Sequence, residues 1–118
     1  IRDSASVDEN AALQIRETVK KGGKLIAVGT TVMRVLESSI FVDNGFKSFN
    51  GSIDTFIKPG HDFKVCSGLF TNFHMPKSTL FILVNAFLGV KKANELYELA
   101  IEKRYRLFSY GDCCLLFP

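Results

Sequence analysis

Residues 24–36 read Lys-Leu-Ile-Ala-Val-Gly-Thr-Thr-Val-Met-Arg-Val-Leu, and this stretch decides the kind of fold. It opens with an almost wholly apolar run, residues 24–28, which is typical of a short strand covered on both faces. Gly29-Thr30-Thr31 then turns the chain, and Val32, Val35 and Leu36 follow at helical spacing. The stretch therefore predicts a strand, a tight turn and a helix, with the strand at the centre of a mainly parallel sheet.

A helix is expected before this stretch, from Ser6 to Lys21. Ser6-Val-Asp-Glu9 has the order of a capping box, in which the Ser6 hydroxyl accepts a bond from a free amide while Glu9 reaches back. Gly22-Gly23 supplies the left-handed residue that ends the helix. The residues of its buried stripe recur every four positions: Ala11, Ile15 and Val19.

An antiparallel hairpin is expected after the central stretch. Asn50-Gly51 separates residues 46–49 from residues 52–57, and both of these segments have strand character. The preference of Asn-Gly for a type I′ turn predicts a two-residue connection between them. Pro59-Gly60 is expected to end the second strand.

The C-terminal half predicts two helices and a strand. Pro76 fits a first helical turn because its missing N–H would have no partner there, and Gly89 ends that helix. Residues 80–88 are apolar nearly all round, so the helix should be buried on most sides. An amphipathic helix over 91–104 and a buried strand over 113–117 complete the chain. We expect one compact unit of the mixed α/β class, with a mainly parallel sheet flanked by helices and one antiparallel hairpin.

The composition excludes several classes of protein. The 118 residues are 47% hydrophobic, enough for one core without disulfides or a structural metal. The net charge of +3 and the pI near 8.8 permit an RNA partner but do not require one. Three cysteines without C-x-x-C or Cys/His spacing indicate a reducing compartment and no metal site. Because no apolar run reaches the roughly 20 residues of a membrane span, we expect a cytoplasmic protein without a membrane partner.

Three polar segments could carry chemistry, and the first is the turn at Gly29-Thr30-Thr31. It places free amides and two hydroxyls at a helix N-terminus, which favours an anion or a carboxylate. The alternative is that Thr30 or Thr31 only caps the helix. Arg34 and Glu37 lie three apart on one helical face, so they could form nothing more than a surface ion pair.

The second segment, residues 71–79, reads Thr-Asn-Phe-His-Met-Pro-Lys-Ser-Thr in front of the buried helix. A polar loop aimed by a rigid helix is a common construction for a site. His74 can exchange protons near neutral pH, and Lys77 beside free amides can hold a carboxylate or phosphate. The alternative is that His74 is a satisfied structural group, as many loop histidines are.

The third segment, residues 104–112, reads Arg-Tyr-Arg-Leu-Phe-Ser-Tyr-Gly-Asp. Its alternation of cations with aromatic rings suits RNA, through phosphate pairing and base stacking. The alternative is that Tyr105 and Phe108 belong to the core, that Arg104 and Arg106 are solvated, and that Gly111-Asp112 is a turn before the last strand.

Four segments taken together resemble one family. They are Gly-Thr-Thr-Val-Met-Arg-Val-Leu-Glu-Ser (29–38), Phe-Ile-Lys-Pro-Gly-His-Asp-Phe-Lys (56–64), Leu-Phe-Thr-Asn-Phe-His-Met-Pro-Lys-Ser-Thr-Leu (69–80) and Tyr-Arg-Leu-Phe-Ser-Tyr-Gly-Asp (105–112). In this order they resemble the C-terminal part of the S-adenosylmethionine:tRNA ribosyltransferase-isomerases of queuosine biosynthesis. The resemblance implies that residues 1–118 are the C-terminal part of the large α/β domain of a two-domain enzyme. The small β-rich domain of that family is absent, so this part alone is expected to be inactive.

The resemblance also implies a reaction and its partners. S-adenosylmethionine is the co-substrate, and its ribosyl unit moves onto the 7-aminomethyl-7-deazaguanine base in the anticodon arm of tRNA. The products are epoxyqueuosine in tRNA, adenine and methionine; no tightly bound cofactor is expected, and a monomer is favoured. This chemistry needs a base for the acidic proton beside the sulfonium, an acid that assists adenine departure, and groups that hold the methionine carboxylate.

Side-chain chemistry at the matching positions gives the candidate residues. His74 is the leading candidate for proton transfer, with Asp112 or Glu37 behind it. Two positions depart from the family pattern: His61 stands where an aromatic such as tyrosine is usual, and Cys113-Cys114 replace small and methionine-like residues. Whether His61 touches substrate stays open. The residues expected to bind substrate are Thr30, Thr31, Arg34, Asn72, Lys77, Ser78, Thr79 and Tyr110.

Two rival interpretations remain. One is a non-catalytic RNA-binding module that uses residues 104–110 and Lys77 as a positive, aromatic surface. It predicts tRNA binding that weakens steeply with salt, without binding of S-adenosylmethionine. The other is a structural α/β domain that binds neither ligand.

Overall fold

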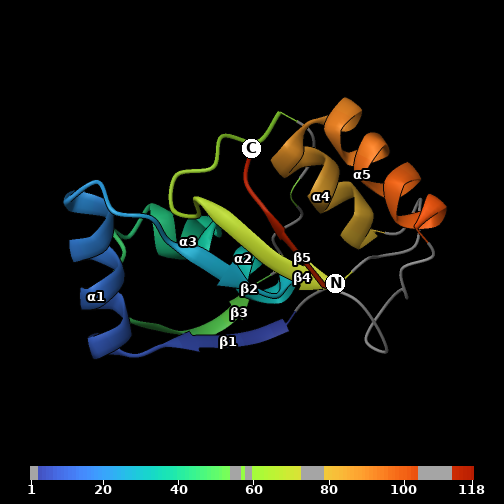
Figure 1. Ribbon diagram of the computed structural model, residues 1–118. Helices are drawn as coiled ribbons and strands as arrows, with labels where there is room; N and C mark the ends of the chain where they lie inside the picture. Colours follow the sequence, from blue (N-terminus) through green and yellow to red (C-terminus); the bar gives the residue numbers. More distant parts are fainter. Residues whose placement is uncertain (1–2, 54–56, 58–59, 73–78, 104–112) are drawn as a thin grey trace.

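The computed structural model describes residues 3–53, 57, 60–72, 79–103 and 113–118 (Figure 1). Among these residues, no helix is long and apolar enough to cross a membrane. In chain order the elements are β1 (Asp3–Val7), α1 (Glu9–Lys20), β2 (Ile26–Val28), α2 (Thr30–Leu36), α3 (Ser39–Val42), β3 (Phe49–Ile53), β4 (Gly68–Asn72), α4 (Thr79–Leu88), α5 (Val90–Glu102) and β5 (Cys113–Leu116).

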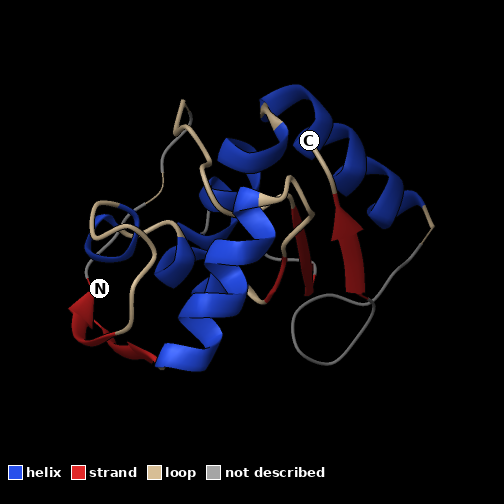
Figure 2. Ribbon diagram, turned by 90° about the vertical axis from the view of Figure 1, so that its left-hand side faces the viewer, coloured by secondary structure: helices blue, strands red, loops and turns tan. Residues whose placement is uncertain are grey.

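The strands form two separate sheets (Figure 2). The three-stranded sheet has the order β2-β4-β5, in which β2 runs parallel to β4 and β5 runs antiparallel to it. The expectation that the strand within residues 24–28 is central is wrong for the described residues, because β4 pairs with a strand on each side and β2 pairs only with β4. The two-stranded sheet pairs β1 with β3 in antiparallel register. The predicted mixed α/β class is confirmed, although the parallel pairing within the described residues is confined to β2 and β4.

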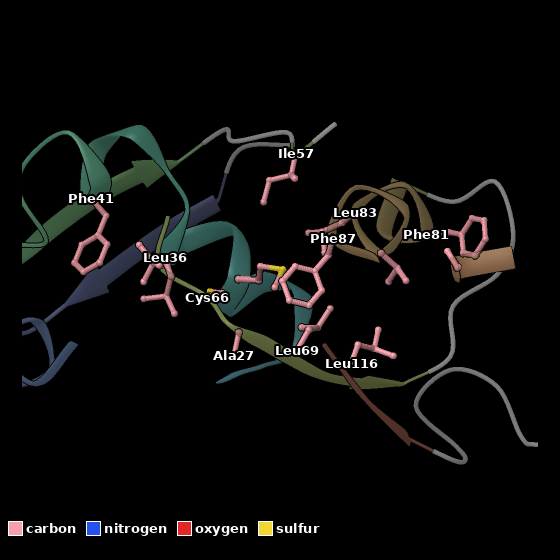
Figure 3. Packing of buried hydrophobic residues seen from close by; sticks show 14 of the residues in the cluster. Ala27, Leu36, Phe41, Ile57, Cys66, Leu69, Phe81, Leu83, Phe87 and Leu116 are labelled. Atoms are coloured by element: carbon pink, nitrogen blue, oxygen red, sulfur yellow. The ribbon is translucent and has the colours of Figure 1, made fainter. Parts of the chain in front are cut away.

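The core lies on one face of the three-stranded sheet. Ala27, Leu69 and Leu116, one from each strand, are 1%, 0% and 6% exposed. Figure 3 shows Leu69 and Leu116 pointing toward the side on which Leu83 and Phe87 of α4 lie. α5 packs against α4 in turn, and the rings of Phe81 and Tyr97 meet edge to face with centroids 4.5 Å apart.

The opposite face of this sheet is exposed, which contradicts the expectation of a strand covered on both faces. Ile26 and Val28 alternate with buried Ala27 and are 42% and 66% exposed. The reason is geometric, because α2 and α4 place their apolar side chains on the face of Ala27 and Leu69.

The first helix begins later than predicted. Ser6 belongs to β1, where it pairs with Asn50, so the predicted capping box is wrong. Asp8 is the N-cap instead, and its Oδ1 accepts the Ala11 amide at 2.7 Å. The predicted end is confirmed: Gly22 has φ +73°, and its amide donates to the Val19 carbonyl at 3.1 Å.

The predicted hairpin at Asn50-Gly51 is also wrong. This pair lies inside β3, where Asn50 is opposite Ser6 and Gly51 is opposite Ala5. Phe49, Gly51 and Ile53 alternate onto one face of the strand, and that face packs toward α3: the Phe49 ring lies 6.0 Å from the Phe41 ring. A turn at 50–51 would break this face, so tertiary packing overrides the local turn preference of Asn-Gly.

The C-terminal elements follow the prediction within the described residues. Gly89, at φ +90°, joins α4 to α5; its amide donates to Asn85 at 2.8 Å and its carbonyl accepts from Ala93 at 3.0 Å. The predicted final strand is β5, but its expected burial is wrong: Leu116 is buried, whereas Cys113 and Leu115 are exposed, because they alternate onto the open face or edge of the sheet. The predicted helix start at Pro76 lies outside the described residues.

The cap of α1 gives a test of the local structure. Asp8→Ala should lower the free energy of unfolding by about 1 kcal/mol, because the Ala11 amide loses its acceptor. Ser6→Ala is the matched control and should change it by less than about 0.5 kcal/mol, as surface substitutions usually do. Urea denaturation followed by circular dichroism measures both; a larger loss for Ser6→Ala would favour a helix that starts at Ser6.

Candidate functional site

The candidate site lies at one edge of the three-stranded sheet. Because β2 and β4 are parallel, their C-terminal ends meet at this edge, and antiparallel β5 begins there. Val28 pairs with Phe70, and Asn72 pairs with Cys113. The turn at residues 29–31 therefore lies at the edge where β4 ends and β5 begins, the usual position of ligand sites in parallel sheets. In the sequence, residues 73–78 follow β4 and residues 104–112 precede β5.

The turn itself is held by its backbone. The Gly29 amide donates to the Phe70 carbonyl at 2.8 Å, which extends the β2–β4 ladder by one residue. Gly29 has φ +100°, a conformation that favours glycine, and it is the N-cap of α2 without a side-chain cap bond. The alternative that Thr30 or Thr31 caps the helix is therefore wrong.

The two hydroxyls of the turn differ in exposure. Thr30 is buried at 6% exposure, whereas Thr31 is exposed. Thr31 lines an open groove of about 360 Å³ between α1 and α2, together with Ile15 and Val35. The exposed Thr31 hydroxyl is the one of the two that a ligand at this edge could reach.

Asn72 closes β4 at the same edge. Its side chain is half-buried, and its Oδ1 lies 2.9 Å from the Cys113 Sγ of the neighbouring strand. The Cys114 Sγ contacts the Thr71 carbonyl at 3.4 Å, and burial, followed by the nearby Cys113, raises the pKa of Cys114 to about 11. Cys114 is therefore a neutral thiol at physiological pH.

The remaining candidates divide into two groups. Arg34, in the last turn of α2, is half-buried, and the backbone of Thr79 begins α4. The candidates outside the described residues are His74, Lys77, Ser78, Tyr110 and Asp112. Within the described part of the chain, the strand register places the turn that carries Thr30 and Thr31 at the same end of the sheet as Asn72. No group of three or more histidine, cysteine, aspartate or glutamate side chains there could hold a metal ion.

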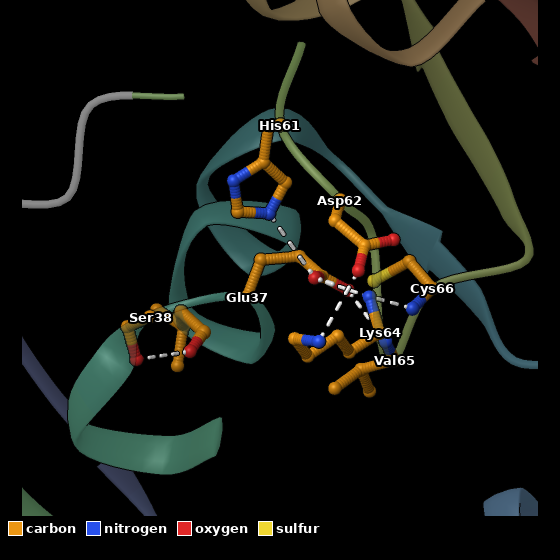
Figure 4. Close-up of polar contacts among 8 residues, drawn as sticks. Glu37, Ser38, His61, Asp62, Lys64, Val65 and Cys66 are labelled. Carbon is orange, nitrogen blue, oxygen red and sulfur yellow. Dashed lines mark hydrogen bonds and ion pairs between the residues drawn. The ribbon is translucent and has the colours of Figure 1, made fainter. Parts of the chain in front are cut away.

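Glu37 lies at the other end of α2, and its carboxylate is fully buried (Figure 4). Its Oε1 accepts the Lys64 amide at 2.9 Å, and its Oε2 accepts the Val65 and Cys66 amides at 2.8 Å each. His61 Nε2 lies 3.3 Å from Oε1. The expectation that Arg34 and Glu37 form a surface ion pair is wrong, because the Glu37 side chain is buried and both of its oxygens accept backbone amides.

The contacts of Glu37 give it a structural task. Residues 61–66 lead into β4, and the carboxylate binds their backbone to the C-terminal end of α2. Burial, followed by the charge of Glu37, raises the pKa of the Cys66 thiol. The spacing of Met33, Leu36 and Glu37 could have revealed this, because positions i, i+3 and i+4 share one face of a helix.

We call the Glu37 carboxylate and the backbone amides of Lys64, Val65 and Cys66 the Glu37 anchor, and His61 lies beside it. Its side chain is 27% exposed, and its ring packs edge-on against Phe63 with centroids 4.6 Å apart. α2 separates His61 and Glu37 from Thr30 and Thr31, because the two pairs are joined to opposite ends of the helix.

Loss of the anchor should destabilise the protein strongly. Glu37→Ala leaves three backbone amides without their acceptor, and the bonds of two of them, Val65 and Cys66, are buried, so it should lower the free energy of unfolding by about 3 kcal/mol or more. Glu37→Gln, which keeps one acceptor oxygen, should fall in between. Asp62→Ala is the control, because Asp62 is 83% exposed and its bond to Lys64 Nζ should contribute less than about 1 kcal/mol. Equal, small losses in chemical denaturation would contradict the anchoring role.

Comparisons with known proteins agree with the resemblance in four segments. A family model described as Queuosine biosynthesis protein matches residues 2–116. The S-adenosylmethionine:tRNA ribosyltransferase-isomerase of Cupriavidus pinatubonensis is 49% identical over 111 residues, 94% of this chain and 32% of that protein. The enzyme of the same name from Halothermothrix orenii is 50% identical over 110 residues, 93% of this chain and 32% of that protein.

A solved structure shares the fold. The crystal structure of S-adenosylmethionine tRNA ribosyltransferase from Thermotoga maritima superimposes with a TM-score of 0.82 at 38% identity, over 95% of this chain and 39% of that chain. This chain thus spans about one third of the length of the curated relatives that it matches. Because the family model covers residues 2–116, the chain belongs to the queuosine biosynthesis protein family.

Proposed function

We propose that this chain is the C-terminal part of the large α/β domain of an S-adenosylmethionine:tRNA ribosyltransferase-isomerase. In this proposal, the sheet edge forms part of the site where the ribosyl unit of S-adenosylmethionine moves onto 7-aminomethyl-7-deazaguanine in tRNA. The observation that supports it is the strand register, in which the turn at 29–31 and the junctions at Asn72 and Cys113 share one edge. The names and the 45–51% identity of eight curated relatives support the substrates.

The reaction distributes three tasks over the candidate residues. A base takes the acidic proton from the carbon beside the sulfonium, and an acid assists the departure of adenine. His74 is the proposed proton-transfer group, with Asp112 as the second. The products are epoxyqueuosine in tRNA, adenine and methionine. The groups proposed to hold the carboxylate, phosphates and polar parts of the substrates are Thr30, Thr31, Arg34, Asn72, Lys77, Ser78, Thr79 and Tyr110.

Glu37 is better suited to anchoring than to proton transfer. A general base must reach the proton that it removes, within hydrogen-bond distance or through one water. The Glu37 carboxylate is fully buried and already accepts three backbone amides at the end of α2 remote from Thr30. We therefore propose that Glu37 acts on the reaction only indirectly, by holding residues 61–66 in position.

The proposed partners follow from the reaction. They are S-adenosylmethionine as co-substrate and the anticodon arm of tRNA, with no tightly bound cofactor, in a monomeric enzyme of the cytoplasm. The RNA-binding module would be favoured instead by salt-sensitive tRNA binding without S-adenosylmethionine binding in a full-length enzyme that carries this chain.

The two histidines of the chain provide the central test. In a full-length enzyme that carries this chain, His74→Ala should lower kcat by about 100-fold or more, the usual contribution of an acid–base group. His61→Ala is the matched control and should leave kcat close to wild type, because His61 contacts Glu37 at the other end of α2. The measurement is tRNA-dependent release of adenine from S-adenosylmethionine. Near wild-type turnover of His74→Ala would refute the assignment.

The Thr31 hydroxyl gives a separate test of substrate binding. Thr31→Val keeps the shape of the side chain and removes the exposed hydroxyl, so KM for S-adenosylmethionine should rise by about tenfold if the hydroxyl bonds a charged group. Thr18→Val is the control, because the Thr18 hydroxyl donates to the Gln14 carbonyl within α1. An unchanged KM for Thr31→Val would remove Thr31 from the site.

A further inference from the structure

The side chains of Asn72 and Cys113 meet where β4 ends and β5 begins. The two residues are directly opposite in the antiparallel ladder, so their side chains point to the same face of the sheet. The Cys113 Sγ lies 2.9 Å from the Asn72 Oδ1, and the thiol is the donor of this hydrogen bond. A cysteine therefore contacts one of the residues proposed to bind substrate.

This contact determines which end of the Asn72 amide is available to a ligand. A side-chain amide has an oxygen that accepts hydrogen bonds and a nitrogen that carries two N–H donors. Because the thiol donates to Oδ1, the oxygen end of the amide is directed toward β5. The Nδ2 end lies on the other side of the planar amide group, and the side chain is only half-buried.

The ligand atom that suits these N–H donors is an oxygen. Hydrogen bonds to an ionised oxygen are stronger than those to a neutral one, so a carboxylate or a phosphate would be preferred. In the proposed reaction, the carboxylate belongs to the methionine part of S-adenosylmethionine and the phosphates belong to tRNA.

The three cysteines of the chain have different surroundings. Cys66 is buried, and Cys114 is half-buried with its thiol donating to the Thr71 carbonyl at 3.4 Å. Cys113 is exposed, and its thiol contacts a side chain. A thiol that donates to a backbone carbonyl supports the strand, whereas one that donates to a rotatable amide orients that amide. Cys114, the next residue on the same strand, is thus a matched control for Cys113.

We propose that Cys113 is a positioning residue for substrate binding: its thiol holds the Asn72 amide with the N–H donors turned toward a carboxylate or phosphate of the substrates. This role rests on the proposed function, in which Asn72 binds substrate. Cys113 departs from the family pattern, in which a small residue is usual at this position. Because a small side chain such as alanine has no donor, the contact with Asn72 distinguishes this chain from relatives that have such a residue.

The kinetics of a full-length enzyme that carries this chain test the role of the thiol. Cys113→Ala removes the donor, so KM should rise by about three- to tenfold, the contribution of one neutral hydrogen bond, while kcat stays close to wild type. Cys113→Ser keeps a donor and should recover most of the lost affinity. Cys114→Ala is the control and should leave KM unchanged, because Cys114 contacts the backbone. Release of adenine, measured with each substrate varied in turn, shows whether the KM for S-adenosylmethionine or the KM for tRNA responds.

A double-mutant cycle shows whether Cys113 acts through Asn72. Asn72→Ala alone should raise the same KM by about tenfold or more, and adding Cys113→Ala should have no further effect, because the amide that the thiol orients is gone. An unchanged KM in Asn72→Ala would refute the binding role of Asn72 in the proposed function, and the positioning role with it. A raised KM in Asn72→Ala beside an unchanged KM in Cys113→Ala would overturn the positioning role alone. So would an equal effect of Cys113→Ala with and without the Asn72 side chain.

The fold of each variant is checked separately. Because Cys113 is exposed, similar midpoints of urea denaturation are expected for the wild type and Cys113→Ala. If Cys113→Ala does not fold, Cys113→Val takes its place, because valine also lacks a donor and favours strands. A folded variant of either kind with wild-type KM for both substrates would overturn the positioning role.

Discussion

The parallel pairing of β2 with β4 is the constraint on which the rest of the structure depends. It places the turn at residues 29–31 beside the end of β4, and it directs α2 back along the sheet from that edge. The Glu37 carboxylate then secures the other end of α2 to residues 64–66, just before β4 begins. Strand pairing at one end and a buried carboxylate at the other hold the helix and both strands as one unit.

This arrangement separates two kinds of polar residue along one short helix. At its start, Gly29 accepts a left-handed backbone and leaves the Thr31 hydroxyl exposed at the candidate edge. At its end, Glu37 is inside the protein with both oxygens occupied, and His61 is its neighbour. The Glu37 carboxylate accepts three backbone amides of the loop that leads into β4, whereas the His61 ring contacts Glu37 and Phe63.

This chain corresponds to one part of the larger enzymes of its family. The relatives are about three times as long, yet the fold of this part is retained in the Thermotoga maritima structure at 38% identity. A sheet core that is complete on one face and apolar on the other is the form expected of a unit that packs against more polypeptide.

The sequence by itself determined the elements whose causes are local and the family to which the chain belongs. The strand–turn–helix at 24–36 and the glycine end of α1 at Gly22 follow from residue type and spacing over a few positions. Tertiary structure alone decided the pairing of Asn50-Gly51 with β1, the burial of Glu37 and the exposure of Val28. The first two depend on contacts with residues distant in the chain, and the third depends on which face of the sheet the helices cover. Neither turn propensity nor helical periodicity encodes which distant surfaces meet.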